Sequence, residues 1–222
     1  YVGISAEQKN TFLDELDNAE SNVFDGPNPA GLVGVQINHV SPVNKGEIVW
    51  TLGAEEVLFI GRLVRTGRVD FSRLIAFGGS EVKHPAYRRC KVGQRLEILL
   101  DDALKPAGHH VRVIDGNPLV GRKANGFLGA HTTEVCVIPE GDDVNEVLGW
   151  IMPRFGELST HRSYLSAFCG KRAYNPDCRV KGGERHMIMS GEYERVFPMD
   201  IYPSYLIKAI IAGDIDRQEA LG

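Results

Sequence analysis

The sequence that organises the chain is Gly182-Gly-Glu-Arg-His-Met-Ile-Met-Ser-Gly-Glu-Tyr-Glu-Arg-Val-Phe-Pro-Met-Asp-Ile-Tyr-Pro-Ser-Tyr-Leu206. Two short apolar runs, 186–189 and 193–197, flank the polar turn 190–192, a pattern that predicts a β-hairpin with Tyr193, Arg195 and Phe197 on one side. Pro198 has no amide proton and would end the second strand. Asp200 can then cap a helix that begins near Pro203.

Four side chains of this stretch are candidates for a contact surface: Glu184, Arg185, Tyr193 and Arg195. Arg offers a planar fork of donors and Tyr a large rigid ring, so both are frequent in protein interfaces. The alternative is an internal Glu–Arg pair that only steadies the hairpin, which is worth at most about 1 kcal/mol when exposed. The pattern leaves both interpretations open.

Composition restricts the class of protein. The chain has 222 residues, enough for one large domain or two to three small ones, and its 43% hydrophobic and 24% charged residues are ordinary for globular proteins. The net charge is −4 and no basic stripe is interleaved with aromatic residues, which argues against nucleic acid as a partner. No apolar run approaches the roughly 20 residues that span a bilayer, so we expect a soluble or peripheral protein.

The first residue is Tyr1, no signal-peptide pattern opens the chain, and residues 218–222 still read as helix, so we expect a fragment of a longer protein. Four cysteines are present, with no Cys-x-x-Cys pair, which argues against a zinc ribbon or an iron–sulfur run and favours a reducing compartment: Cys90, Cys136, Cys169 and Cys178. Cys136 lies in an apolar run and is expected in the core.

Residues 1–81 predict a partial Rossmann-like α/β domain. Alternation over 47–52 favours a strand, helical spacing over 54–65 favours a helix ended by Gly67, and 73–77 reads as a buried strand parallel to the first. Leu58 and Leu63 are expected on the buried face of that helix. The glycine-rich stretch 26–34 does not match a phosphate-binding pattern, and His39 is expected to be a hydrogen-bonded packing residue rather than a ligand.

Residues 82–141 predict a small α+β module of the β-grasp type, and residues 142–222 a mixed region that ends in a helix. The elements expected in these two parts are strands at 88–92, 111–116, 118–121, 134–138 and 148–153 and helices at 95–100, 159–168 and 202–211. His109 and His110 would point to opposite faces of a strand and cannot share a metal. Asp101-Asp102 and Asp142-Asp143 fit turn ends better than acid–base pairs. We therefore expect no catalytic, cofactor-binding or metal-ligating residue.

Several motifs together resemble one family, the A subunit of the bacterial Na⁺-translocating NADH:quinone oxidoreductase. The likeness runs from about Gly26 to Gly222 and is carried by Pro29-Ala-Gly-Leu-Val-Gly34, Ile60-Gly61, Thr66-Gly-Arg68, Gly182-Gly-Glu-Arg185 and Tyr193-Glu-Arg-Val-Phe-Pro-Met-Asp-Ile201. The family is more distantly similar to the NADH-binding flavoprotein of respiratory complex I and to the C subunit of the Rnf complex. Val82-Lys-His-Pro85 followed by Lys91-Val-Gly93 resembles the start of their shared β-grasp ligand-binding module.

The resemblance implies a peripheral subunit on the cytoplasmic side of the bacterial inner membrane, structural and close to the quinone. It implies that this chain binds no redox cofactor and is not catalytic alone, that flavins and iron–sulfur centres belong to other subunits, and that quinone is the substrate of the complex. Its expected partners are the other subunits and quinone. Two alternatives are a soluble flavin- or NAD-dependent dehydrogenase fragment and a β-grasp module that binds a small ligand.

Overall fold

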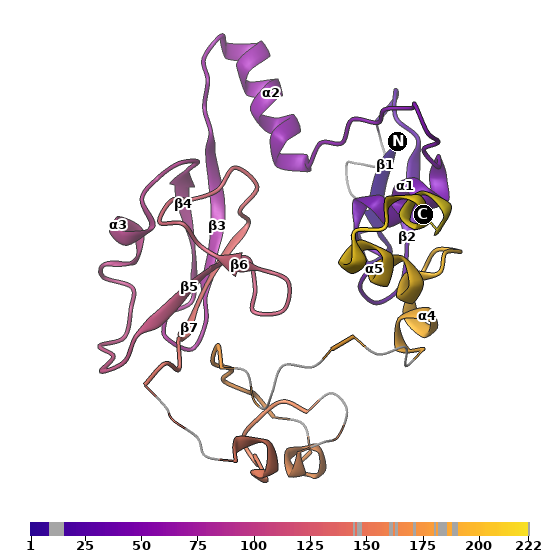
Figure 1. The fold of residues 1–222 in the computed structure, drawn as a ribbon. Coiled ribbons are helices and arrows are strands. Elements are labelled where there is room, and N and C mark those ends of the chain that lie inside the picture. Colours follow the sequence, from indigo (N-terminus) through magenta and orange to yellow (C-terminus); the bar gives the residue numbers. More distant parts are fainter. Residues whose placement is uncertain are drawn as a thin grey trace. The chain divides into compact units, whose positions relative to one another are not determined.

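The computed structural model describes residues 1–8, 16–143, 145, 148–159, 162, 164–170, 172–179, 181, 186–187 and 191–221 (Figure 1). The chain divides into two compact units. One, here the terminal unit, comprises Tyr1–Leu52 and Arg185–Gly222; the other, the central unit, comprises Gly53–Glu184. Mixed α/β architecture is thereby confirmed. The predicted domain limits at 81/82 and 141/142 stay a prediction.

The terminal unit contains a parallel pair of strands, β1 (Val2–Ser5) and β2 (Ser21–Phe24), with Val2 opposite Ser21. A short 3₁₀ turn, η1 (Ala6–Gln8), follows β1, and α1 (Val33–Val40) follows the glycine-rich loop. A side chain at Gly3 would overlap that of Gln36, so α1 lies directly against β1. The C-terminal helices are α4 (Glu192–Val196), α5 (Pro203–Ala212) and α6 (Ile215–Leu221). The predicted helix at 202–211 and the helical end of the chain are confirmed.

The strand predicted at 47–52 is wrong, because these residues, all of them described, adopt no regular structure. Ile48 is 82% exposed and Trp50 91% exposed. Alternation over so few residues does not specify a strand unless a neighbouring strand is available for pairing. The expected parallel pair of 47–52 and 73–77 therefore does not exist.

The central unit is built on a five-stranded mixed sheet in the order β4-β3-β7-β5-β6. The strands are β3 (Ser72–Gly78), β4 (Ala86–Lys91), β5 (Val111–Asp115), β6 (Arg122–Lys123) and β7 (Glu134–Pro139). β3 and β7 are parallel and the other neighbours antiparallel. The short helix α3 (Leu96–Leu100) buries Leu96, Leu99 and Leu100 in the core of one sheet face. This helix-on-sheet arrangement is the one expected of a β-grasp module.

The strand predicted at 118–121 is wrong. Residues 118–120 form a turn, because the side chain of Asn117 accepts hydrogen bonds from the backbone N–H of Leu119 (3.0 Å) and Val120 (3.1 Å). An Asn side chain often forms such hydrogen bonds with nearby backbone N–H groups, and these compete with the backbone pairing that a strand requires.

Helix α2 (Ala54–Thr66) ends as predicted at Gly67, which adopts a left-handed conformation with φ of 66°. The predicted burial of its leucines is wrong: Leu58 is 55% exposed and Leu63 43%. Polar and aromatic contacts hold the helix instead. Phe59 meets Phe71 edge to face with ring centroids 5.6 Å apart, and the Arg62 guanidinium donates to the carbonyl of Ser72 at 3.0 Å.

Between β7 and α4, the described residues have little regular structure. The strand predicted at 148–153 is wrong, since η3 (Gly149–Ile151) is a single 3₁₀ turn there. The helix predicted at 159–168 is reduced to the 3₁₀ turn η4 (Leu165–Phe168) in its described part; residues 160, 161 and 163 lie outside the described residues. Polar contacts between distant residues, described below, hold this segment in place of backbone ladders.

Candidate functional site

The structure places two of the four predicted surface residues. Tyr193 and Arg195 lie on α4, whereas Glu184 and Arg185 lie outside the described residues. The strand predicted at 193–197 is wrong, because 192–196 is helical. Acidic side chains in the first turn, Glu192 and Glu194, suit a helix N-terminus, and a five-residue alternation does not distinguish a strand from one helical turn. The first predicted strand, 186–189, lies in part outside the described residues.

Helix α4 is a surface helix: none of its five described residues is buried. Arg195 pairs with Glu192 at 3.1 Å, with the Arg side chain 73% exposed, and Tyr193 is 46% exposed. In an α-helix, the side chains of residues i and i+2 point in directions about 200° apart around the helix axis. The expectation that Tyr193 and Arg195 share one face is therefore wrong, since they project from different sides of α4.

Glu194 has a role that the sequence assigned to Asp200. Its Oε1 accepts a hydrogen bond from the backbone N–H of Ser204 at 3.1 Å, in the first turn of α5. The N-cap position of α5 is Tyr202 rather than Asp200, and no side-chain cap hydrogen bond forms there, so the predicted capping by Asp200 is wrong. Contacts with Ser204 lower the pKa of Glu194. A carboxylate at this place also interacts favourably with the positive N-terminal end of the α5 helix dipole. The same hydrogen bond connects α4 to α5.

His39, at the end of α1, binds this region to the rest of the terminal unit. Its Nε2 lies 3.1 Å from the carbonyl oxygen of Pro198, between α4 and α5. The predicted hydrogen bond of His39 is thus present, but the residue is exposed and does not pack in a core, so that part of the prediction is wrong. Together with Glu194 it fixes the base of α4 and leaves Tyr193 and Arg195 exposed.

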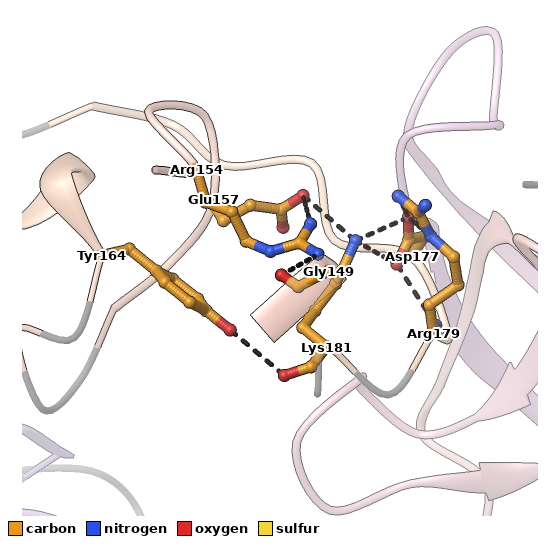
Figure 2. A network of polar contacts seen from close by, with 7 residues as sticks. All are labelled: Gly149, Arg154, Glu157, Tyr164, Asp177, Arg179 and Lys181. Carbon is orange, nitrogen blue, oxygen red and sulfur yellow. Dashed lines mark hydrogen bonds and ion pairs between the residues drawn. The ribbon is translucent and has the colours of Figure 1, made fainter. Parts of the chain in front are cut away.

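A second polar cluster, which the sequence did not reveal, lies in the segment after β7 (Figure 2). The ammonium of Lys181 is central to it, 3.0 Å from a carboxylate oxygen of Glu157 and 2.9 Å from one of Asp177. Arg179 contacts Asp177 through its guanidinium at 2.6 Å and its Nε at 2.8 Å. We call these four residues, with Arg154, the charge network.

The charge network is largely withdrawn from solvent. The Lys181 and Asp177 side chains are 14% and 15% exposed, and that of Arg154 is 5% exposed. Burial would raise the pKa of Asp177, but hydrogen bonds from Arg179 and Lys181 outweigh it and hold the pKa below its usual value. The carboxylate is therefore charged at neutral pH. Each charge of the network faces an opposite charge, so the network stabilises the fold of this segment. It is not arranged to donate or accept a proton.

Further contacts connect the charge network to neighbouring parts of the chain. Arg154 donates to the carbonyl of Gly149 at 2.9 Å and lies over the ring of Tyr164, 5.9 Å from its centroid. The hydroxyl of Tyr164 in turn donates to the carbonyl of Lys181 at 3.4 Å. Figure 2 shows how these side chains link residues that are 32 positions apart in the chain, from 149 to 181.

The segment is also attached to the sheet. The backbone N–H of Cys178 donates to the carbonyl of Pro139, the last residue of β7, at 3.2 Å. A side chain at Gly141 would overlap that of Arg179, which shows how closely the segment lies against the end of β7. The Arg112 guanidinium, from β5, pairs with Glu140 beside this attachment.

The central unit also has a hollow of about 470 Å³ between α3 and the β5–β6 edge of the sheet. Its wall is mostly apolar, with Leu100, Leu104, Val111 and Val113, and Lys123 lies at its rim. Small-ligand sites have this combination of an apolar wall and a few polar groups. The hollow is therefore the candidate site for a ligand of the β-grasp module.

The four cysteines form no disulfide, and of these only Cys169 is exposed. Burial raises the pKa of the Cys90, Cys136 and Cys178 thiols, which keeps them protonated. Within the described ranges, no three His, Cys, Asp or Glu side chains lie together as a metal site would require. Among the described helices, none is long and apolar enough to cross a membrane.

Comparison with known proteins gives a consistent result over both units. A family model described as "NqrA second alpha/beta domain" matches residues 1–69, and one described as "NQRA C-terminal domain" matches residues 74–126. The chain is 38% identical over 208 residues to the A subunit of the Na⁺-translocating NADH-quinone reductase of Vibrio atlanticus and to that of Neisseria meningitidis serogroup C. It is 39% identical over 210 residues to that of Pasteurella multocida. These matches cover 92–93% of the chain and 46% of each relative, so the chain spans about half the length of the curated relatives it matches.

Proposed function

The chain belongs to the family of the A subunit of the Na⁺-translocating NADH-quinone reductase, and we propose that it works as a peripheral, non-catalytic part of that membrane complex. The reductase activity is that of the assembled complex, with quinone as its substrate. The chain lies on the cytoplasmic side of the bacterial inner membrane, in contact with other subunits. Flavins and iron–sulfur centres are held by those subunits.

The observation that carries the proposal is the exposure of Tyr193 and Arg195 on a helix whose base is fixed. Glu194, in the middle of α4, binds Ser204, and Pro198, two residues after the helix, binds His39, so the outer side chains are presented on a supported helix. An ordered Tyr and Arg lose little conformational entropy when a partner binds them. We propose that α4, together with Glu184 and Arg185, contacts the subunit that holds the quinone site.

The test is the double variant Tyr193→Ala and Arg195→Ala in the full complex. We expect weaker assembly of the subunit or a higher apparent KM for quinone, with the melting temperature of the chain unchanged. The matched control is Tyr205→Ala with Arg217→Ala, because Tyr205 is 54% exposed and Arg217 forms an exposed pair with Asp214 three positions away, as Arg195 does with Glu192. Wild-type assembly and wild-type quinone dependence in the first variant would refute the role of α4.

We also propose that this chain holds no redox cofactor tightly. The loop at 26–34 lacks a phosphate-binding glycine pattern, and the raised pKa values of three thiols disfavour cluster ligation. Calorimetry of the chain with NADH and with flavin mononucleotide is expected to give no binding at micromolar concentrations. A micromolar or tighter constant for either would instead favour the soluble dehydrogenase fragment.

The hollow between α3 and β5 supports a second candidate function, a small-ligand-binding module. Ala124 lines the hollow, so the variant Ala124→Phe would fill part of it. A ligand that raises the melting temperature of the wild-type chain and not of this variant would establish the site. A shift of equal size in both would place the binding elsewhere.

A further inference from the structure

The sheet of the central unit has an open edge at β4. The sheet order places β4 outermost, as Figure 1 shows, with only β3 as a neighbour. Ser72 lies opposite Lys91, and one step further along the N–H of Val92 donates to the carbonyl of Phe71 at 3.4 Å. Because hydrogen-bonded pairs alternate along an antiparallel ladder, Cys90 and Arg88 also direct their backbone groups to β3.

It follows that Tyr87 and Arg89 direct their N–H and C=O groups away from the sheet. Over the described part of the chain, no backbone hydrogen bond is formed on this outer side of either residue. The outer groups of Lys91 are already used, because its N–H donates to the Gln94 side chain at 3.2 Å and its carbonyl accepts from the Gln94 N–H at 3.1 Å. The open edge therefore has a defined length that ends at the turn after β4.

The side chains along this edge are positively charged and exposed. Tyr87 is 74% exposed, and Arg89 and Lys91 are exposed on the same face of the strand. Neither cation forms an ion pair within 4 Å of a residue that the structure describes. Arg88, on the opposite face, differs in this respect, since it contacts Asp102 at 3.3 Å and the carbonyl of Leu99 at 2.8 Å. Asp70 is the nearby acidic group: hydrogen bonds with Ser72 mainly lower its pKa, and the charge of Arg89 contributes.

A hollow of about 630 Å³ lies at the end of the edge. It is lined by Ser72, Arg89, Lys91 and Gln94, so both unpaired cations border it. The open backbone groups, the two cations and this hollow are thus continuous along one side of the sheet.

We propose that β4 binds an extended acidic segment of a partner subunit as an additional strand. Main-chain hydrogen bonds to Tyr87 and Arg89 would supply the pairing, and carboxylates beside Arg89 and Lys91 would supply the specificity. The inference rests on the proposed function only for the source of the segment, another subunit of the complex.

Two other occupants are disfavoured by the same features. A second copy of this chain would bring its own Arg and Lys against Arg89 in an edge-to-edge pair, and like charges directly opposite destabilise a sheet. An anionic lipid surface is recognised by clusters of about four to eight cations and does not pair with a strand edge. The unpaired backbone groups therefore favour a polypeptide.

The experiment places a photo-crosslinking phenylalanine derivative at position 87 in cells that express the full chain with the complex. We expect adducts with one segment rich in Asp and Glu from another polypeptide. The variant Arg89→Glu with Lys91→Glu is expected to lower the adduct yield at least about tenfold. The control Arg65→Glu with Arg68→Glu changes the charge equally at exposed positions without ion pairs among the described residues, and should keep the yield.

A second variant, Arg89→Pro, tests the backbone pairing. It removes an N–H that points outward and leaves the bonds to β3 in place, so the chain should fold and the adduct should be lost. Adducts only with lipid, only with this chain, or with an acidic segment at unchanged yield in both variants would overturn the inference. If the inference is overturned but the wild-type chain still co-purifies with the other subunits, the proposed function stands. If the chain co-purifies with none of the other subunits, the proposed function fails, whichever adduct is found.

Discussion

The guanidinium of Arg73, in β3, forms an ion pair with the carboxylate of Glu55, in the first turn of α2. The Arg73 side chain is 2% exposed and also donates to the carbonyl of Ala130, while its guanidinium lies over the ring of Phe59, 5.9 Å from the centroid. Burial lowers the pKa of Arg73. A charge within a strand, rather than an apolar face, thus fastens α2 to the sheet.

Removing the acidic partner should be costly. In the variant Glu55→Ala the buried guanidinium of Arg73 loses its counter-charge, and the expected loss is about 3 kcal/mol of unfolding free energy. Urea unfolding of the chain measures it. The control is Glu97→Ala, whose partner Arg95 is 60% exposed and whose loss should cost less than about 1 kcal/mol. Equal midpoints for the two variants would show that the Arg73 pair does not hold α2.

The leucines of α2 should matter less than the helical pattern suggests. Leu58 is more than half exposed, so Leu58→Ala is expected to cost less than about 1 kcal/mol. Leu100, in α3, is 4% exposed in the core, and Leu100→Ala should cost about 2–5 kcal/mol. A similar loss for both in urea unfolding of the same chain would mean that Leu58 is buried in solution.

Acid should weaken the charge network through Asp177. Its folded-state pKa lies below the usual value of 3.8, so the unfolded chain takes up the proton first as the pH falls. The stabilisation is complete above about pH 5, well above the unfolded pKa, and is lost as the pH falls through the folded pKa. Asp177→Asn should cost about 1–3 kcal/mol at pH 7 and flatten this acid dependence of the urea midpoint.

The matched control for that experiment is Asp143→Asn, because Asp143 is exposed and forms no hydrogen bond or ion pair with a described residue; its charge only adds to the contacts with Asp142 that raise the pKa of His110. It should leave both the midpoint at pH 7 and the acid dependence unchanged. An Asp177→Asn chain that retains the full acid dependence would assign that dependence to other carboxylates.

Sequence patterns correctly predicted the helices and strands whose periodic pattern extends over many residues or whose ends carry a clear signal, such as a glycine. Helical spacing over 54–65, followed by Gly67, located α2, and the apolar runs of β3 and β7 located the two central strands. Alternation over five or six residues failed at 47–52 and at α4, because a run so short also fits irregular chain or a single helical turn.

The sites required contacts that no local pattern contains. Lys181 and Glu157 are 24 positions apart in a segment without periodicity, so their pairing is visible only in the folded chain. The exposure of Tyr193 and Arg195 was predictable from their chemistry, but their relative direction depended on the type of element that carries them. The Arg73–Glu55 pair was hidden because a cation at a buried strand position contradicts the usual pattern.

Two glycines of the central unit, Gly79 and Gly93, differ in how closely a neighbouring strand approaches them. Gly79 and Gly93 both adopt positive φ, 109° and 79°, so alanine is strained at either position. A Cβ at Gly79 would overlap the backbone of Val137, in β7, whereas a Cβ at Gly93 has no neighbour within 4 Å. The carbonyl of Val137 accepts the N–H of Glu81 at 3.1 Å, so the chain after β3 has no room to move away without losing that bond.

Gly93→Ala should therefore cost only the backbone strain, about 1 kcal/mol, and Gly79→Ala at least about 3 kcal/mol. Urea unfolding of the two variants compares the terms, because the difference between them reports the close approach of residue 79 to β7 together with the less favourable φ at that position. Hydrogen exchange gives an independent measure: the amide of Glu81 should lose protection in Gly79→Ala and keep it in Gly93→Ala. Equal losses of stability with equal protection would show that the strand end at Gly79 relaxes away from Val137, and that the close packing of β3 on β7 does not depend on glycine.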